Sequence, residues 1–152
     1  HEVTLTLVGY GNQKDTLIDE VKHRQLHNVI FIEQPTKDIL LKTYQDADIF
    51  LFASTTETQG IVLAEAMATS NPVIACKATG AEDIIEDGSN GYLINSPEEM
   101  AAKIKEFMGN PELLQNLQRQ AQKTAEGYRS SSMAQKLIDC YVILISRADH
   151  PQ

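Results

Sequence analysis

The sequence predicts an α/β fold in which a parallel sheet is covered by helices on both faces. Short apolar segments alternate along the chain with segments of helical periodicity, as in proteins built from β-α-β units. The apolar segments are apolar throughout, which is typical of parallel strands that are buried on both sides. With 152 residues, of which 42% are hydrophobic and 22% charged, the chain is long enough to bury a core.

Each element follows from a local pattern. Strands are expected at residues 3–8, 29–32, 48–53, 72–76 and 92–94, where short runs of apolar and β-branched residues stand. Helices are expected between them, at residues 13–25, 37–45, 60–69 and 81–86. After the last strand the pattern is helical only, over residues 97–108, 110–125 and 130–146. Ser96 followed by Pro97 is typical of a helix start. This order of elements predicts a Rossmann-like fold.

The chain is expected to form one domain over residues 1–152, because neither an internal repeat nor a linker divides it. It begins at His1, directly ahead of the first expected strand. We therefore expect a piece of a longer protein, truncated at the N-terminal edge of this domain.

Charge and composition argue against several classes of function. The net charge of −8 argues against a nucleic-acid partner, because such proteins concentrate Lys and Arg. No apolar run approaches the roughly 18 residues of a transmembrane helix. Cys76 and Cys140 stand far apart, and the histidines show no metal-ligand spacing, so no metal site is expected. We expect a reduced, cytoplasmic setting; for a longer parent, peripheral contact with the inner face of the membrane stays open.

Ligands of such sheets bind outside the carboxyl ends of the strands, so the loops after the strands are the ones to inspect. Gly9 and Gly11 follow the first strand, but Lys14 stands where a dinucleotide-binding loop would have its third glycine. A tight turn is the favoured interpretation, and a phosphate contact is the alternative. Asp46 and Asp48 form a D-x-D pattern used by some metal-dependent sugar transferases. Here they precede a strand, at the opposite end of the sheet, and are interpreted as solvated or capping residues.

The most informative segment is residues 54–68, which follows the third strand. Gly60 lets the backbone approach a ligand closely, and the N–H groups at the start of the following helix would face anionic or hydroxyl oxygens. Glu65 is the one polar residue between Gly60 and Thr69. A diol would supply donors to its carboxylate. The alternative, favoured on these residues taken by themselves, is that Glu65 lies on the exposed stripe of an amphipathic helix.

Glu57 and Glu65 form an E-x7-E pattern within ETQGIVLAEAMA, followed in order by PVI, GAEDII and DGSNGYL. This set resembles the nucleotide-sugar half of the family 4 retaining glycosyltransferases, which have the GT-B fold. The resemblance extends from Val3 to about Tyr141. It implies transfer of a hexosyl group from a UDP- or GDP-sugar to a glycan or lipid acceptor with retention. Several pathways stay open, including sucrose-type ones, and cell-envelope polysaccharide or glycolipid synthesis is expected because it is the most common.

The resemblance also implies roles for single residues. Glu57 would be the catalytic residue that contacts hydroxyls of the donor sugar, and Glu65 would accept hydrogen bonds from the ribose diol. Backbone groups would bind the rest of the donor. The sugar and diphosphate would lie against Thr58, Gln59, Gly60 and Ile61, the base would be framed by Glu33, Gln34 and Pro35, and Gly9 would lie at the same edge.

No metal or other cofactor is implied, so protein donors must offset the charge of the leaving diphosphate. The family's basic clamp for the diphosphate lies ahead of residues 3–8, and the acceptor-binding domain is absent from this chain. The chain by itself is therefore expected to be inactive.

The sequence departs from the family pattern in two places, and two other functions stay open. Thr58 and Gln59 follow Glu57 where many members have a small residue and Phe, and Ser70 stands where Gly is commoner. The alternatives are a non-catalytic Rossmann-like nucleotide-binding module and half of a sugar-nucleotide epimerase. An epimerase would call for further carboxylates and histidines at the strand ends.

Overall fold

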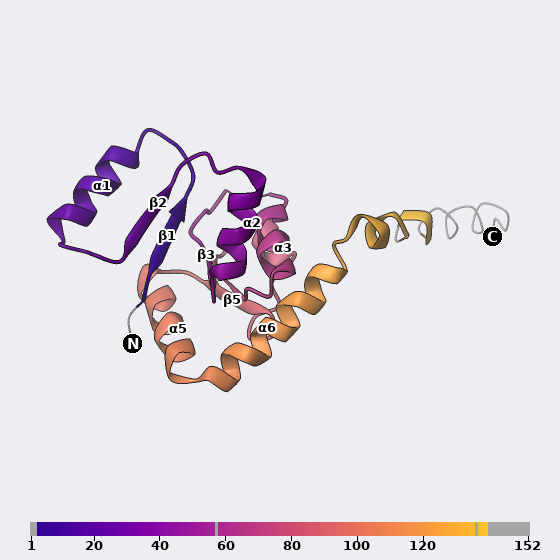
Figure 1. Cartoon of the computed structure of the whole chain (residues 1–152). Coiled ribbons are helices and arrows are strands. Elements are labelled where there is room, and N and C mark those ends of the chain that lie inside the picture. The colour runs from indigo at the N-terminus through magenta and orange to yellow at the C-terminus, as the bar shows by residue number, and fades with distance from the viewer. Residues whose placement is uncertain (1–2, 57, 136, 140–152) are drawn as a thin grey trace, which may run out of the picture. The chain divides into compact units, whose positions relative to one another are not determined.

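The computed structural model describes residues 3–56, 58–135 and 137–139. The chain divides into two compact units, His1–Thr43 and Tyr44–Gln152, and each is described by itself (Figure 1). Within the described residues no helix is both long and apolar enough to cross a bilayer.

The first unit is one β-α-β element followed by the start of a helix. It contains β1 (Leu5–Val8), α1 (Lys14–His23), β2 (Val29–Ile32) and most of α2 (Lys37–Asp46). The two strands are parallel, with Leu5 opposite Val29 and Val8 opposite Ile32. Parallel strands require a crossover, which α1 provides. Across residues 3–43, all of which the structure describes, no side chain is fully buried.

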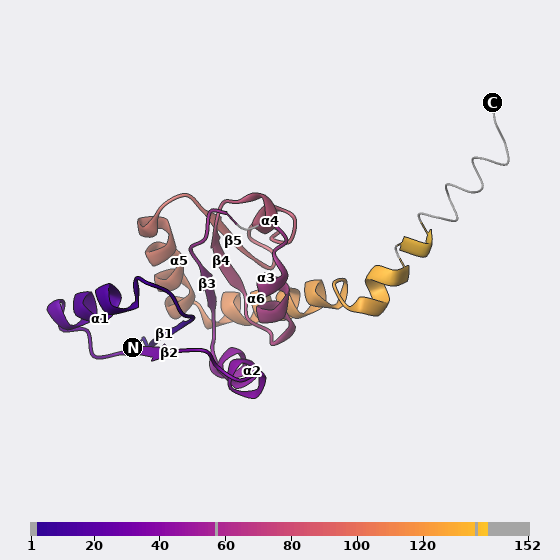
Figure 2. The ribbon, with the colours of Figure 1, turned by 90° about the horizontal axis from the view of Figure 1, so that it is seen from above.

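The second unit is a three-layer arrangement around a parallel sheet. Its strands are β3 (Phe50–Phe52), β4 (Val73–Cys76) and β5 (Gly91–Ile94), with β4 in the middle. Its helices are α3 (Ile61–Ala68), α4 (Thr79–Glu82), α5 (Pro97–Gly109) and α6 (Pro111–Glu126). Figure 2 shows α3 and α5 on opposite sides of the sheet, which agrees with the contacts of α3 with β3 and β4 and of α5 with β4 and β5.

The core of this unit lies on both faces of β4. Val73, Ile74 and Ala75 are all inaccessible to solvent, as expected for a central strand that is apolar throughout. On one face Ile74 packs with Ile94, with Phe107 of α5 and with Leu117 of α6. The helix α3 supplies further buried side chains, among them Leu63 and Met67.

Local contacts fix the helix starts and the last strand. Ser96 Oγ accepts a hydrogen bond from Glu99 N (3.2 Å), and Asn110 Oδ1 accepts one from Leu113 N (3.1 Å), so both α5 and α6 begin at capped residues.

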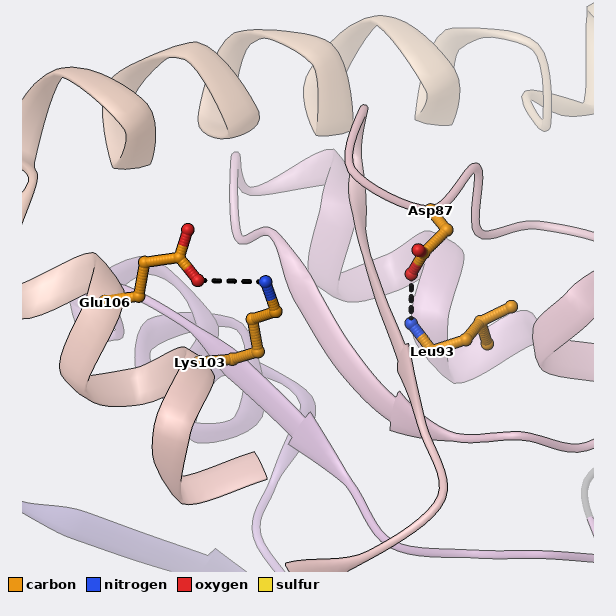
Figure 3. Close-up of polar contacts among 4 residues, drawn as sticks. All are labelled: Asp87, Leu93, Lys103 and Glu106. Atoms are coloured by element: carbon orange, nitrogen blue, oxygen red, sulfur yellow. Dashed lines mark hydrogen bonds and ion pairs between the residues drawn. The ribbon is translucent and has the colours of Figure 1, made fainter. Parts of the chain in front are cut away.

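Beside β5, Asp87 Oδ1 accepts a hydrogen bond from Leu93 N at 2.8 Å (Figure 3). On α5, Lys103 Nζ lies 2.9 Å from Glu106 Oε2 (Figure 3). The same amine stands 3.9 Å from the centre of the Tyr92 ring, so α5 and β5 are joined by a cation–π contact.

The predicted fold class is confirmed, with differences in detail. The described strands form two parallel ladders, β1–β2 and β3–β4–β5, which lie in different units. The helix expected at residues 81–86 begins earlier, at Thr79, and ends at Glu82. Beyond it, the Asn90 side chain bonds the backbone of Ile84 and Glu86 (3.0 Å each) and holds a turn there. Of the helix expected at residues 130–146, residues 130–135 and 137–139 are helical, and the remainder lies outside the described residues. The single domain over residues 1–152 stays a prediction.

Candidate functional site

The loop between β3 and α3 leaves the carboxyl end of β3, the edge at which parallel sheets bind ligands. Thr58, Gln59 and Ile61 are exposed there. Ser54 Oγ accepts a hydrogen bond from Thr56 N at 3.3 Å, which turns the chain directly after the strand. Glu57, the predicted catalytic residue, lies outside the described residues.

Two glycines bring this loop against α4. Gly60 has φ +64°, in the left-handed region, and its carbonyl accepts hydrogen bonds from Leu63 N (3.0 Å) and Ala64 N (3.2 Å) at the start of α3. A Cβ at Gly60 would stand 2.5 Å from the carbonyl oxygen of Gly80. A Cβ at Gly80 would stand 2.8 Å from Thr58 C and 2.9 Å from Gln59 N. Only glycine fits at either position without moving the loop.

Glu65 lies on α3 behind this loop, and its side chain is exposed. The side chain of Tyr44, in the last turn of α2, contacts the side chain of Glu65. Burial, the charge of the Glu65 carboxylate and a side-chain hydrogen bond with that carboxylate raise the pKa of Tyr44 to about 12. The phenol therefore stays protonated at neutral pH and donates a hydrogen bond to the Glu65 carboxylate. The exposure of Glu65 agrees with the exposed-stripe alternative, but its contact with Tyr44 was not predicted.

Tyr44 is itself held on several sides. Its backbone carbonyl accepts a hydrogen bond from Asn71 Nδ2 at 2.6 Å, and its ring centre stands 5.6 Å from that of Phe50. The same Asn71 amide donates to Thr69 Oγ1 at 3.0 Å, and Asn71 is almost fully buried. Between these two residues Ser70 has φ +67°, in the left-handed region, where the chain turns from α3 into β4.

The remaining predicted site residues lie in the first unit, where the structure brings them to one edge. Gly9 follows β1, and Gly9 N donates to Ile32 O at 3.1 Å, so the ends of the two strands are joined. Glu33, Gln34 and Pro35 follow β2. Gln34 has φ +44°, an uncommon conformation for a residue with a side chain and one that concentrates at functional sites.

Glu33 already has a partner at this edge. Its Oε2 lies 2.6 Å from Lys14 Nζ, and both side chains are exposed (48% for Glu33 and 38% for Lys14). The hydrogen bond with Glu33, and secondarily the charge of that carboxylate, raise the pKa of the Lys14 amine above its ordinary value.

The D-x-D acids lie where the sequence places them. Asp46 ends α2, and Asp48 stands just before β3, at the end of the strand opposite to the loop of residues 53–60. The described residues contain no group of three His, Cys, Asp or Glu side chains that could hold a metal ion.

Sequence reasoning missed three residues at these sites. Tyr44 falls within the helix expected at residues 37–45 and was given no role there, and Lys14 was noted only because it stands where a dinucleotide-binding loop would have its third glycine. Gly80 was noted within a motif, without a role. The two glycines at 60 and 80 were a usable signal, because each follows a strand at the same sheet edge, where a residue without a Cβ favours a close backbone approach.

Residues 1–124 match the sequence profile of the family described as "Glycosyl transferases group 1". Over 145 residues the chain is 34% identical to the alpha-monoglucosyldiacylglycerol synthase of Acholeplasma laidlawii. The matched region covers 93% of this chain and 36% of that protein. The chain thus spans about a third of the length of the curated relatives it matches.

Solved structures give the same result. The C-terminal domain of a group 1 glycosyl transferase from Francisella tularensis is 30% identical and covers 74% of this chain and 60% of that one, with a TM-score of 0.68. The pneumococcal O-GlcNAc transferase GtfA, solved with UDP and GlcNAc, has a TM-score of 0.78 at 25% identity and covers 94% of this chain and 30% of that one. Anabaena HepE, solved with UDP-glucose, has a TM-score of 0.72 at 28% identity and covers 90% and 41%.

Proposed function

Because this chain belongs to the group 1 glycosyltransferases and corresponds to the C-terminal, donor-binding half of their GT-B fold, we propose that it binds a nucleoside diphosphate sugar. Of the two bases left open by the sequence, uracil is favoured, since two of the similar structures were solved with UDP or UDP-glucose. Donor binding is the activity we propose for this chain by itself, and sugar transfer is that of a whole protein.

One observation carries the proposal: an exposed carboxylate, Glu65, stands on α3 directly behind a loop that two glycines hold at the carboxyl edge of β3. An ionised carboxylate accepts hydrogen bonds only, and its two oxygens suit the paired hydroxyls of a ribose. The loop and the first N–H groups of α3 lie next to it. Helix N-termini attract anions, so the diphosphate is assigned to Gly60 and Ile61.

The sugar and the base of the nucleotide sugar are assigned to the neighbouring segments. We assign the sugar to Glu57, Thr58 and Gln59, which lead into that helix, and the base to the edge formed by residues 33–35. Glu57 would contact the sugar hydroxyls while the bond from the anomeric carbon to the diphosphate breaks. A new bond would form from that carbon to the acceptor hydroxyl oxygen on the same face, which gives retention, and the hydroxyl proton would leave with the diphosphate. The positive end of α3 would offset the charge that develops on the leaving diphosphate.

We also propose that the donor binds without a metal ion, because Asp46 and Asp48 lie at the opposite end of β3 from the proposed site. For the whole protein, an acceptor that is a glycan or a lipid is proposed, in cell-envelope synthesis. A lipid acceptor is supported by the Acholeplasma relative, whose name is that of a monoglucosyldiacylglycerol synthase.

Saturation-transfer NMR on the chain tests this proposal. UDP, GDP, ADP and UDP-glucose are each titrated, with and without EDTA, against the unsubstituted chain (called the parent chain below) and against the variants Glu65→Gln and Glu112→Gln. Glu112 is an exposed carboxylate in the first turn of α6 and serves as the matched control. We expect saturation of the ribose and base protons of UDP that EDTA does not change, and affinity about tenfold or more lower in Glu65→Gln alone.

Equal affinity of the parent and Glu65→Gln would contradict the role of Glu65. A lack of response to every nucleotide by a folded chain would contradict donor binding and favour a non-catalytic module.

A further inference from the structure

The carboxylate of Glu65 already accepts a hydrogen bond from within the protein, and the function proposed above does not use that bond. It comes from the Tyr44 hydroxyl. Glu65 is exposed on α3, whereas Tyr44 is largely buried in the last turn of α2. An exposed glutamate has many rotamers, and fixing one of them costs conformational entropy. A buried partner that is itself immobile can restrict that choice before a ligand arrives.

Tyr44 meets this requirement. Its backbone carbonyl is held by the buried Asn71 amide at 2.6 Å, and its ring packs against Phe50 with 5.6 Å between ring centres. The Asn71 amide is in turn held by Thr69 Oγ1 at 3.0 Å, at the end of the same helix that carries Glu65. The backbone and ring of Tyr44 are therefore held in place, and its hydroxyl contacts Glu65 on α3.

Resting on the proposed function, we infer that Tyr44 is a positioning residue for donor recognition, whose hydroxyl orients the Glu65 carboxylate to accept the ribose diol. The hydrogen-bond inventory permits this. A carboxylate offers about four lone-pair sites, so one bond from a phenol leaves room for two ribose hydroxyls. The phenol takes up one of these sites as a donor, because a pKa of about 12 leaves the proton on its oxygen at neutral pH.

This arrangement makes Tyr44 a residue that favours ribose hydroxyls without touching them. Its hydroxyl matters for a nucleotide that has the 2′ and 3′ hydroxyls, and is without effect for one that lacks both. A tyrosine that serves packing alone would affect both ligands equally. This difference separates a positioning role from a structural one.

The test compares Tyr44→Phe with Tyr128→Phe by isothermal titration calorimetry with UDP and with 2′,3′-dideoxy-UDP. Tyr44→Phe keeps the ring and removes only the hydroxyl. The Tyr128 hydroxyl donates to Asp83 O at 3.0 Å within the same unit, so Tyr128→Phe is a matched loss of one phenol bond elsewhere. Thermal melting of each variant reports on folding. If GDP binds more tightly than UDP in the first titration, GDP and its dideoxy analogue replace the uridine pair.

We expect Tyr44→Phe to weaken UDP binding by about tenfold, the loss that corresponds to one hydrogen bond. Binding of the dideoxy analogue should change by less than about twofold, and Tyr128→Phe should leave both ligands unchanged. Adding Tyr44→Phe to Glu65→Gln should cost nothing further, since both changes remove one coupled interaction.

Equal losses for both ligands, or no loss of UDP affinity in Tyr44→Phe while Glu65→Gln is impaired, would overturn this inference and leave the proposed function intact. Unaltered binding in Glu65→Gln, or no nucleotide binding by the parent chain, would instead overturn the proposed function and this inference with it.

Discussion

In the second unit, the candidate loop lies against Gly80 with backbone atoms in contact, whereas in the first unit Glu33 is held by an ion pair with Lys14 that is open to solvent. The loop rests on a sheet whose central strand is fully buried. The edge that carries Glu33 rests on a two-stranded ladder without a buried side chain in residues 3–43. Isolated two-stranded ladders are marginal, and exposed ion pairs contribute little stability.

The two groups of candidate residues are therefore expected to respond to mutation differently. Around Thr58 and Gly60, position is set by close packing, so changes there should lower stability. Around Glu33, the ion pair with Lys14 is exposed, so its loss should change local electrostatics and leave stability nearly unaltered. Three substitutions probe this contrast.

The largest effect is expected from Phe107→Ala. Phe107 is 1% exposed and packs with Ile74, Ile94 and Leu117 beneath the sheet, so truncation leaves a cavity. The free energy of unfolding should fall by roughly 3–5 kcal/mol in urea denaturation. Leu17→Ala is the matched change in the first unit, where Leu17 is 47% exposed, and should cost less than about 1 kcal/mol. Similar losses for the two variants would contradict the conclusion that the second unit has the better-packed core.

A smaller effect, which extends to binding, is expected from Gly80→Ala. The new Cβ would meet the backbone of Thr58 and Gln59 at 2.8 and 2.9 Å, so the loop must shift. We expect a loss of roughly 1–3 kcal/mol in unfolding free energy and weaker UDP binding by calorimetry. Gly109→Ala is the control, because a Cβ there meets nothing within 4 Å. It should leave UDP binding and stability unchanged or raise stability slightly. Parent-like UDP affinity in Gly80→Ala would show that the loop is not set by this contact.

The smallest effect is expected from Glu33→Gln. Replacing the carboxylate by an amide removes the charge and leaves a weaker, uncharged acceptor for the Lys14 amine, so the lysine pKa should fall toward 10.5. Nitrogen-detected NMR of the lysine amines measures this directly. No measurable change in urea midpoint is expected. A clear loss of stability would mean that the first unit depends on this pair more than its exposure indicates.

Much of the fold was predictable from the sequence because each element is written in a local pattern. The apolar run at residues 72–76 predicted a strand buried on both sides, and β4 is that strand. Ser96 and Pro97 marked the start of α5 to the residue. The division of the strands into two ladders was not predictable, because strand pairing depends on contacts between segments distant in the chain.

The sequence indicated which loop to inspect, but it did not indicate the tertiary contacts that hold this loop and Glu65. The helix expected over residues 60–69 is α3, which begins one residue later than predicted, at Ile61, and ends at Ala68. The contact of Tyr44 with Glu65 was missed, because the helical period of residues 37–45 shows only that Tyr44 faces inward. The hydroxyl at the end of that ring carries no periodic signal. The close approach of Gly80 to Thr58 was also missed, because it joins the loop after β3 to α4, two segments distant in the chain. The assigned roles of Glu57 and of residues 33–35 stay predictions.

Ser70 sits in a left-handed conformation at the turn into β4, a position where the resembling family more often has glycine. A side chain there costs on the order of 1 kcal/mol in the folded state. Glycine would relieve that cost but would enlarge the unfolded ensemble, which offsets part of the gain. The first effect is the larger, so the turn holds the chain in a slightly strained conformation where α3 passes into β4.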